Sequence, residues 1–235
     1  MLKFEENHWW FSGRREILNS YLNRLKINKN SKIFEIGCGT GSNLNMLSKH
    51  GNVTAMEPSD VAVYHLKKKN IENIQFFKGS CPEDLSDSKK YDLICMFDVL
   101  EHISGDKEAV LKSLSMLNKN GRLFITVPAY QWLWSTHDEN LMHKRRYTKD
   151  SLISLFQDVN VIEEHFTYFN TILFPFAILD RVKKNFFKRY DYEENLPNIF
   201  INYIFKKIFI FEKFLLNFFS FSFGLSIILI IKKNK

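Results

Sequence analysis

Three glycines at alternate positions, Gly37, Gly39 and Gly41, lie within the segment FEIGCGTGS. They follow a short apolar run typical of a strand and precede a helical pattern. Glycine backbone can lie directly against a ligand at the N-terminus of a helix. Glu57, twenty residues beyond Gly37, ends the next apolar run, where its carboxylate could accept hydrogen bonds from both hydroxyls of a ribose. Together these residues predict a site for an adenosine-containing ligand.

Two common nucleotide sites do not match this segment. A dinucleotide-binding loop requires a glycine at its sixth position, which here is Ser42. A P-loop requires a lysine followed by serine or threonine, and FEIGCGTGS contains no lysine. The glycine loop therefore predicts neither a dinucleotide site nor a P-loop.

The order and spacing of four features resemble the motifs of class I S-adenosylmethionine-dependent methyltransferases. These features are EIGCGTG, Glu57, FDVLEHI and NKNGRLFITVP, and they cover roughly residues 31–130. HWWF-x-GRR near the start, and HD followed by H-x-RRYT, are similar to a bacterial subgroup of that family. The resemblance implies an α/β fold: a Rossmann-like three-layer αβα sandwich with a mostly parallel seven-stranded sheet and an antiparallel last strand. It also implies S-adenosylmethionine as the cofactor.

The same resemblance implies roles for particular residues. Glu35 and the three glycines would line the methionine part of the cofactor, Glu57 would hold the ribose, and Pro58 would lie beside the adenine. Many members have an aspartate after strand three, where this chain has Ser80 and Cys81, so the Ser80 hydroxyl or backbone groups would contact the adenine. The sulfonium centre would be flanked by Phe97, Asp98 and Val99.

Three histidines are candidates for a catalytic base, which is needed only if the acceptor loses its proton in or before methyl transfer. His102 follows the turn that would contact the cofactor, and histidine titrates near neutral pH. Alternatively, His102 is a structural residue that begins the turn Glu101-His102-Ile103. His137 and His143 lie in a segment without periodicity that runs from Pro128 to Tyr147.

That long segment is the predicted acceptor wall. Its length is more typical of functional loops than of simple connections. Because it follows the fifth strand, it faces the carboxyl ends of the strands, where ligands bind in open α/β sheets. Arg145 and Arg146 either bind an anionic acceptor or pair with Asp138 or Glu139 to fold the loop.

Alternating apolar runs and amphipathic stretches predict the elements that position these residues. Strands are expected at 32–36, 53–56, 74–77, 91–97, 122–127, 159–166 and 227–231, and helices at 43–49, 60–69, 106–117 and 150–158. Asn120-Gly121 is expected to turn the chain into the fifth strand. An earlier helix, capped by Ser12, carries an apolar face from Ile17 to Leu25.

The block HWWFSGRR lies at the start of that first helix. Consecutive helical side chains point about 100° apart, so Trp9, Trp10 and Phe11 cannot all contact one flat surface. We expect Trp10 to belong to a lid that excludes water from the cofactor and Arg14 to pair with the cofactor's carboxylate. The alternative is a staple that holds the helix to the core.

The aromatic and basic tail allows several interpretations. Residues 214–231 carry no charge, so a membrane-spanning helix must be considered, but the polar residues in the middle favour a helix, a turn and a last strand. Phe and Ile beside Lys and Arg, as at 186–189 and 204–209, suit an interfacial helix on an anionic membrane. They suit equally a cap over the active site or a homodimer contact.

Composition narrows the class of protein further. At 235 residues, 45% of them hydrophobic, the chain can bury a large core. Three cysteines without a C-x-x-C pair argue against disulfides and a zinc site and fit the cytoplasm, and no metal is expected. The start of the chain lacks the apolar segment of a secretory signal. The net charge of +7 is spread over short lysine bursts, and no N/D-P-P-Y/F tetrad follows strand four, so no nucleic-acid partner is expected.

These patterns predict four segments and one function. The segments are an N-terminal lid and helix (1–30), a core that binds S-adenosylmethionine (31–167), an aromatic and basic insertion (168–223) and the last strand of the sheet (224–235). The function is methyl transfer to an oxygen or nitrogen of a small-molecule or lipid-linked acceptor, with peripheral membrane contact or a homodimer as open partners. The alternatives are a non-catalytic cofactor-binding or membrane-associated protein and a nucleic-acid methyltransferase.

Overall fold

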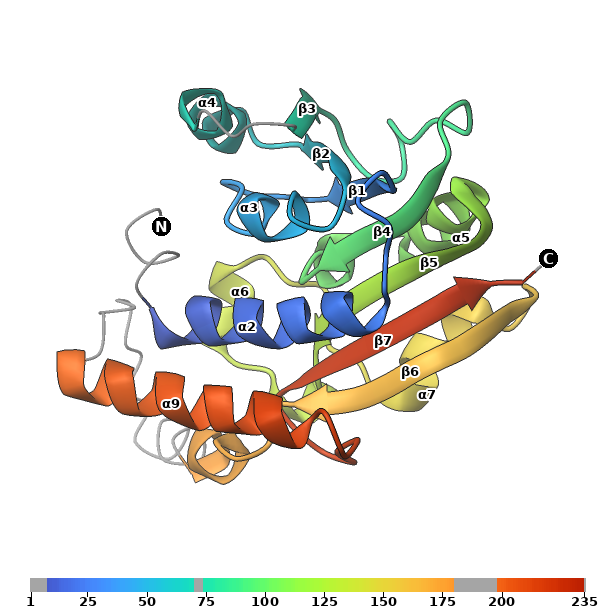
Figure 1. Cartoon of the computed structure of the whole chain (residues 1–235). Coiled ribbons are helices and arrows are strands. Elements are labelled where there is room, and N and C mark those ends of the chain that lie inside the picture. The colour runs from blue at the N-terminus through green and yellow to red at the C-terminus, as the bar shows by residue number, and fades with distance from the viewer. Residues whose placement is uncertain (1–7, 70–73, 180–197, 235) are drawn as a thin grey trace.

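The computed structural model describes residues 8–69, 74–179 and 198–234, and these form a seven-stranded sheet in the order β3-β2-β1-β4-β5-β7-β6 (Figure 1). The strands are β1 (Lys32–Ile36), β2 (Asn52–Glu57), β3 (Ile74–Lys78), β4 (Tyr91–Phe97), β5 (Leu117–Pro128), β6 (Val161–Phe169) and β7 (Ser226–Lys233). Strands β1 to β5 pair in parallel, and β7 is antiparallel to both β5 and β6. The predicted antiparallel last strand is confirmed.

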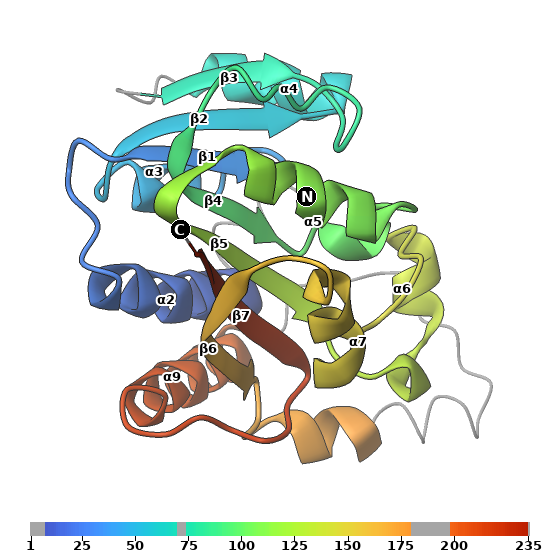
Figure 2. The ribbon, with the colours of Figure 1, turned by 90° about the vertical axis from the view of Figure 1, so that its right-hand side faces the viewer.

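Helices cover both faces of the sheet, which confirms the three-layer αβα sandwich (Figure 2). One face carries α2 (Trp9–Arg24), α3 (Leu44–Leu47), α4 (Asp60–Lys68) and α9 (Ile199–Leu215). The other carries α5 (Asp106–Ser115), α7 (Lys149–Ile153) and the short η3 (Ser154–Phe156). Between β4 and α5 lies η1 (Leu100–His102), and after β5 come η2 (Gln131–Leu133) and α6 (Thr136–Asn140).

The burial of the central strands explains why their positions could be predicted from the sequence. In β4 every residue from Leu93 to Phe97 is buried, and β7 is buried from Ser226 to Ile231. Strands covered on both faces carry continuous apolar runs rather than alternating ones. The strands 32–36 and 91–97 have the predicted bounds.

Three predicted boundaries were wrong for identifiable reasons. Helix α2 begins at Trp9 and is capped by His8, whose Nδ1 accepts from the Trp10 amide at 3.2 Å, so Ser12 lies inside the helix. Strand β5 begins at Leu117, so Asn120 lies inside the strand and not in a turn before it. Asn120 has a positive φ of 63°, and the pairing of β5 with β4 shifts register instead of ending there. The helix expected over 150–158 ends at Ile153 and continues as η3.

The charge-free stretch near the end of the chain forms the end of α9, a turn and β7, as predicted. Among the residues that the structure describes, no helix is long and apolar enough to cross a membrane. Strand β6 continues to Phe169, two residues into the predicted insertion. The predicted cluster at 186–189 lies outside the described residues.

Candidate functional site

The glycine loop follows β1 at the carboxyl edge of the sheet. All three glycines have positive φ, which residues with a Cβ rarely adopt. At Gly37 a Cβ would lie only 2.6 Å from Cγ2 of Val99, so the loop and the turn after β4 approach closely. At Gly39 a Cβ would meet no atom within 4 Å. The loop therefore presents bare backbone to an open space.

Glu57 fixes that loop from the end of β2. Its Oε2 accepts a hydrogen bond from the Gly39 amide at 2.8 Å, and its Oε1 accepts from the Ser59 amide at 3.0 Å. The side chain is buried. Because each carboxylate oxygen has two lone pairs, Glu57 keeps capacity for ligand hydroxyls. Pro58, the next residue, is exposed beside it.

Glu35 lies inside the protein behind the loop, with one oxygen unpaired. Its Oε1 accepts from Nδ2 of Asn43 at 2.9 Å, whereas Oε2 is buried with no hydrogen-bond partner in the described part of the chain. Burial raises the pKa of Glu35 to about 7. A buried carboxylate oxygen without a donor is costly, so this position fits a cationic or hydrogen-bond-donating group of a ligand.

Asp98 and Arg14 form an ion pair at the end of β4. The Arg14 guanidinium, buried in α2, contacts Oδ2 of Asp98, and Thr126 Oγ1 donates to Oδ1 at 2.9 Å. Asp98 has a φ of 54°. The first helix therefore reaches the cofactor edge, but Arg14 has a carboxylate partner inside the protein. Its predicted pairing with the cofactor stays a prediction.

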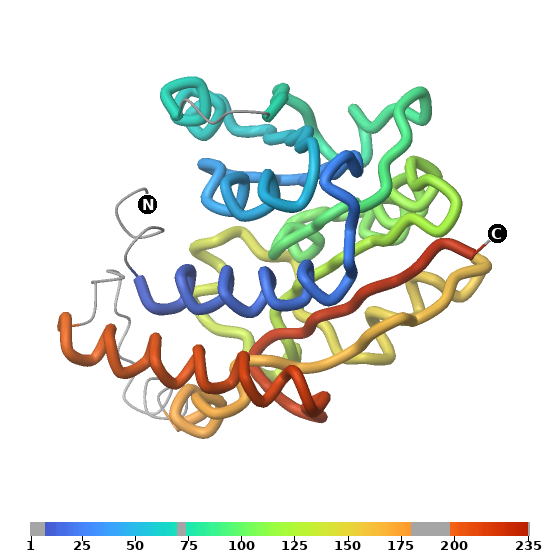
Figure 3. The backbone as a smooth tube through the Cα atoms, viewed as in Figure 1, coloured from blue at the N-terminus to red at the C-terminus, as the bar shows by residue number. Residues whose placement is uncertain are grey.

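The aromatic block at the start of α2 contacts α9 and the end of β6, and the two helices lie side by side (Figure 3). Trp10 stacks on Phe169 with ring centroids 6.0 Å apart, and Trp9 meets Phe205 and Phe209 edge-on at 5.2 and 5.4 Å. At Gly13 a Cβ would lie 2.4 Å from Phe209, so the helices touch closely. These are the contacts of a staple; the lid role of Trp10 stays a prediction.

The remaining predicted cofactor residues occupy the same edge of the sheet. Phe97 is buried at the end of β4, with its ring edge-on to Phe124 at 5.0 Å. After β3, the amide of Ser80 donates to Oδ2 of Asp84 at 2.8 Å, and the exposed side chain of Ser80 precedes the partly buried Cys81. Burial raises the pKa of the Cys81 thiol to about 12, so the thiol is neutral at physiological pH.

Two of the three candidate histidines meet next to the turn after β4. The rings of His102 and His143 lie 4.7 Å apart at 78°, although 41 residues separate them in the sequence. Partial desolvation and the neighbouring His143 lower the pKa of His102. His137 is exposed on α6 and is not part of this cluster.

Asp138 organises the loop after β5. It is fully buried and accepts from His143 Nδ1 at 2.9 Å and from Arg146 Nε and Nη2 at 2.7 and 3.0 Å. Burial alone would raise the pKa of Asp138, but the hydrogen bonds from His143 and Arg146 hold it well below its ordinary value. Arg145 pairs with Asp106. Of the two predicted roles for these arginines, Arg146 takes the one that folds the loop.

Glu101 was not among the residues singled out from the sequence. It is 1% exposed, and neither carboxylate oxygen has a hydrogen-bond partner among the described residues. Burial, followed by the nearby Asp98 carboxylate, raises the pKa of Glu101 well above its ordinary value. The sequence offered one indication of its importance: Glu101 directly precedes His102 and follows the turn that is expected to contact the cofactor. Asn43 and Thr126, which hold Glu35 and Asp98, carried no such signal.

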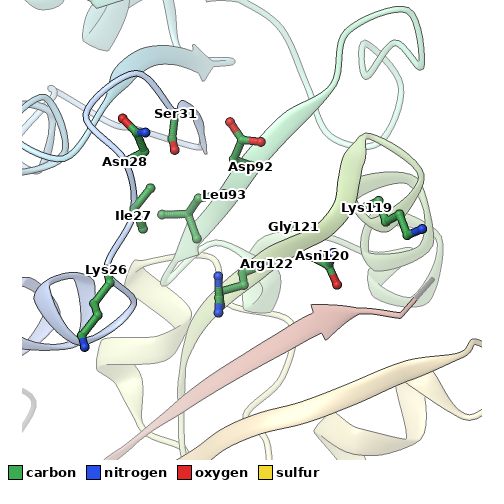
Figure 4. A pocket seen from close by; sticks show the side chains of 10 residues that line it. All are labelled: Lys26, Ile27, Asn28, Ser31, Asp92, Leu93, Lys119, Asn120, Gly121 and Arg122. Atoms are coloured by element: carbon green, nitrogen blue, oxygen red, sulfur yellow. The ribbon is translucent and has the colours of Figure 1, made fainter.

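A pocket of about 180 Å³ lies at the opposite edge of the sheet and is not the candidate site (Figure 4). It is formed at the amino ends of β1 and β4 and the first half of β5, by Lys26, Ile27, Asn28, Ser31, Asp92, Leu93, Lys119, Asn120, Gly121 and Arg122. Ligands in open α/β sheets bind at the carboxyl ends of the strands, where the glycine loop lies.

Known proteins share both this fold and parts of this sequence. A ubiquinone biosynthesis O-methyltransferase of Pelagibacter ubique (strain HTCC1062) is 33% identical over 102 residues, which are 41% of this chain and 42% of that protein. The matched segments span 42% to 60% of the lengths of the first curated relatives.

Two solved methyltransferase structures are similar over nearly the whole chain. The plantazolicin methyltransferase BpumL in complex with SAH has a TM-score of 0.63 at 15% identity, covering 99% of this chain and 88% of that one. Coclaurine N-methyltransferase bound to N-methylheliamine and SAH has a TM-score of 0.59 at 17% identity, covering 93% and 72%. At these identities the likeness shows a shared fold.

A family model described as a methyltransferase domain matches residues 10–170. The match begins at the aromatic block of α2, contains the glycine loop, Glu57 and the His102–His143 cluster, and ends just after β6. Because it spans more than half of the chain and includes every residue of the candidate site, this chain belongs to the methyltransferase domain family.

Proposed function

We propose that this chain transfers a methyl group from S-adenosylmethionine to an oxygen of a small-molecule or lipid-linked acceptor. The observation that carries the proposal is the buried Oε2 of Glu35, which has no hydrogen-bond partner among the described residues and lies behind the glycine loop that is open at Gly39. Family membership supports the reaction class, and the relative from Pelagibacter ubique, named as an O-methyltransferase, supports oxygen as the acceptor atom. The segments HWWF-x-GRR and H-x-RRYT support membership of the bacterial subgroup.

The residues present fit this cofactor. Glu35 offers its free oxygen to the ammonium group of the methionine part, and Glu57 offers its remaining lone pairs to the ribose hydroxyls. The exposed Pro58 and the Ser80 side chain border the adenine position. Phe97, Asp98 and Val99 border the sulfonium.

When bound, the cofactor supplies an electrophilic methyl group. This methyl group would pass to the acceptor oxygen, the S–CH₃ bonding pair would stay on sulfur, and the acceptor hydroxyl would give up its proton. His102 takes that proton, because a lowered pKa keeps its ring neutral and able to accept at neutral pH. The other contribution of the protein is alignment and exclusion of water.

The outer face of α9 supports an acceptor that resides in a membrane. Exposed apolar side chains lie on one face of this helix, at Phe200, Tyr203, Phe211 and Phe214, and Phe218 follows just beyond its end. Lys206 and Lys207 lie among them. An apolar stripe with lysines suits the anionic surface of the cytoplasmic leaflet. We therefore place the protein at that surface, with α9 as its contact.

Cofactor binding and turnover test the main proposal. Isothermal titration of the full chain with S-adenosylmethionine should show one site, and Glu57→Ala and Glu35→Gln should weaken binding at least tenfold. Lys119→Ala, in the pocket at the far edge, is the matched control and should bind normally. Wild-type protein that does not bind at millimolar cofactor would refute the proposal. Transfer of a labelled methyl group to a lipid extract, compared with an aqueous metabolite extract, identifies the acceptor class.

Co-sedimentation with vesicles tests the membrane contact. The protein should bind phosphatidylserine-containing vesicles at low salt and detach as salt rises, since exposed charges are screened. The double variant Phe214→Ser/Phe218→Ser should lose binding, whereas Val61→Ser, an equally exposed apolar position on α4, should not. If binding is absent and sedimentation shows a concentration-dependent dimer that the double variant abolishes, the stripe is a dimer contact instead.

A further inference from the structure

Three potential metal ligands converge beside the candidate methyl-transfer site. Glu101 and His102 come from η1, and His143 comes from the loop after α6. Each offers one ligand atom, and these three atoms lie within 4.8 Å of one another. The amide of Lys144 donates to the Glu101 carbonyl at 2.8 Å, which ties the two segments together. Distances of this size leave room for one cation between the ligands.

The carboxylate of Glu101 supplies a second, independent indication. Both of its oxygens are buried and lack a hydrogen-bond donor within the residues the structure describes. The two arginines whose charges act on Glu101 already have carboxylate partners: Arg14 pairs with Asp98, and Arg146 pairs with Asp138. A buried carboxylate needs a counter-charge or donors, and a cation held together with His102 and His143 would supply one.

His143 is oriented as a metal-binding histidine is. The Asp138 carboxylate, fixed by two hydrogen bonds from Arg146, accepts from Nδ1 of His143 at 2.9 Å. With the proton on Nδ1, the lone pair of the neutral ring is on Nε2. In metal sites, a ligating imidazole commonly donates its other N–H to a carboxylate, which fixes both the tautomer and the ring orientation.

We propose that Glu101, His102 and His143 bind a divalent transition-metal cation of the Zn²⁺ or Mn²⁺ class. Two imidazoles and one carboxylate favour such ions over Mg²⁺ and Ca²⁺, which prefer oxygen ligands. Three protein ligands leave coordination positions open for solvent or substrate. Cysteine spacing, on which the sequence-based expectation of no metal rested, is uninformative for a site made of histidine and glutamate.

The location suggests what the cation would do. Glu101 lies only three residues after Asp98, which is expected beside the sulfonium. A cation there would bind the acceptor oxygen, lower the pKa of its hydroxyl so that solvent can take the proton, and hold it in line with the methyl group, with His102 as a ligand in place of the base. This role rests on the proposed methyl transfer; metal binding itself does not.

Direct titration tests the site. Full-length protein stripped with a chelator is titrated with Zn²⁺ or Mn²⁺ by calorimetry, and with Co²⁺ by its visible absorption. We expect one cation per chain, a metal-dependent rise in melting temperature, and at least a tenfold loss of affinity in Glu101→Gln, His102→Ala and His143→Ala. Asp138→Asn should weaken binding by about 10- to 100-fold, because it removes the outer partner of His143.

Controls make the result decisive. His65→Ala, on α4 next to β3, should bind the cation as wild type does, and far-ultraviolet circular dichroism identifies any variant that fails to fold. The near-isosteric Glu101→Gln keeps the test available if a histidine variant unfolds. The proposed metal site would be wrong if Glu101→Gln bound the cation as tightly as His65→Ala does. It would also be wrong if the wild-type protein did not bind one cation per chain. Binding without any effect of the chelator on methyl transfer would overturn only the role in acceptor activation.

Discussion

Two glutamates at the ends of neighbouring strands have different surroundings, and their chemistry differs accordingly. Glu57 accepts two backbone hydrogen bonds and holds the glycine loop in place. Glu35 accepts one side-chain hydrogen bond, and its other, buried oxygen has no partner in the part of the chain that the structure describes. Glu57 therefore holds the loop in its conformation, whereas Glu35 has an oxygen available for a bound ligand.

Cofactor affinity should depend on pH through Glu35. Burial raises the pKa of Glu35 to about 7, so the carboxylate is increasingly protonated as the pH falls below that value. A cationic group binds only the ionised form well, so affinity should fall about tenfold between pH 8 and pH 6. Glu35→Gln should bind weakly at both pH values and remove this dependence. Titration calorimetry checks it, and equal wild-type affinity at pH 6 and pH 8 would contradict it.

Alanine at two glycines should separate stability from binding. Gly37→Ala places a Cβ 2.6 Å from Val99 at a φ of 69°, so it should lower the free energy of unfolding by about 2–4 kcal/mol. Gly39→Ala meets open space and should cost only about 1 kcal/mol of backbone strain. It should nevertheless weaken cofactor binding, because its methyl group enters the ligand space. Urea unfolding and calorimetry give the two quantities; the reverse pattern would place the ligand elsewhere.

At the scale of elements, the contact between α2 and α9 joins two helices that are far apart in the sequence. Sequence periodicity predicted the apolar face of α2 but not its partner, because Trp9 and Phe205 are nearly two hundred residues apart. Glu212 shows the same limit. In the sequence, Glu212 looks like a solvent-exposed charged residue of α9. In the structure it is buried and accepts hydrogen bonds from the backbone amides of Asn170, Thr171 and Ile172.

Phe209 and Phe211 should respond differently to truncation. Phe209 is fully buried between α2 and the sheet, so Phe209→Ala should destabilise the protein by about 3–5 kcal/mol. Phe211 is 56% exposed on the opposite side of the same helix, and Phe211→Ala should change stability by no more than about 0.5 kcal/mol. Urea denaturation compares them. Similar losses in both would mean that α9 is covered on its outer face.

The site was less predictable from sequence than the strands that carry it. Strands such as 32–36 are encoded locally by apolar runs, and their carboxyl ends locate the cofactor edge. The meeting of His102 with His143, and of Arg14 with Asp98, depends on how a long loop and a docked helix return to that edge. Local patterns do not encode how distant segments meet, so these four residues were found from the sequence but their two pairings were not.

At the scale of the whole molecule, ligand binding and folding are linked. Residues of the candidate site come from α2, β1, β2 and the turn after β4, so unfolding would destroy it. Cofactor at about 100 times its dissociation constant should therefore stabilise the protein by about 2.7 kcal/mol. Thermal melts with and without S-adenosylmethionine measure this. Glu57→Ala should show a much smaller shift, and an equal shift would assign the binding to another place.

The position of β7 has a consequence for synthesis on the ribosome. β7 follows β5 and β6 in the sequence, yet it lies between them, and among the described residues neither strand has another sheet partner on that side. Until residues 226–233 leave the exit tunnel, β6 cannot join the sheet and the edge of β5 stays open. The nascent chain thus completes this sheet only after residues 226–233 have been made, and until then the open edge of β5 can pair with another chain.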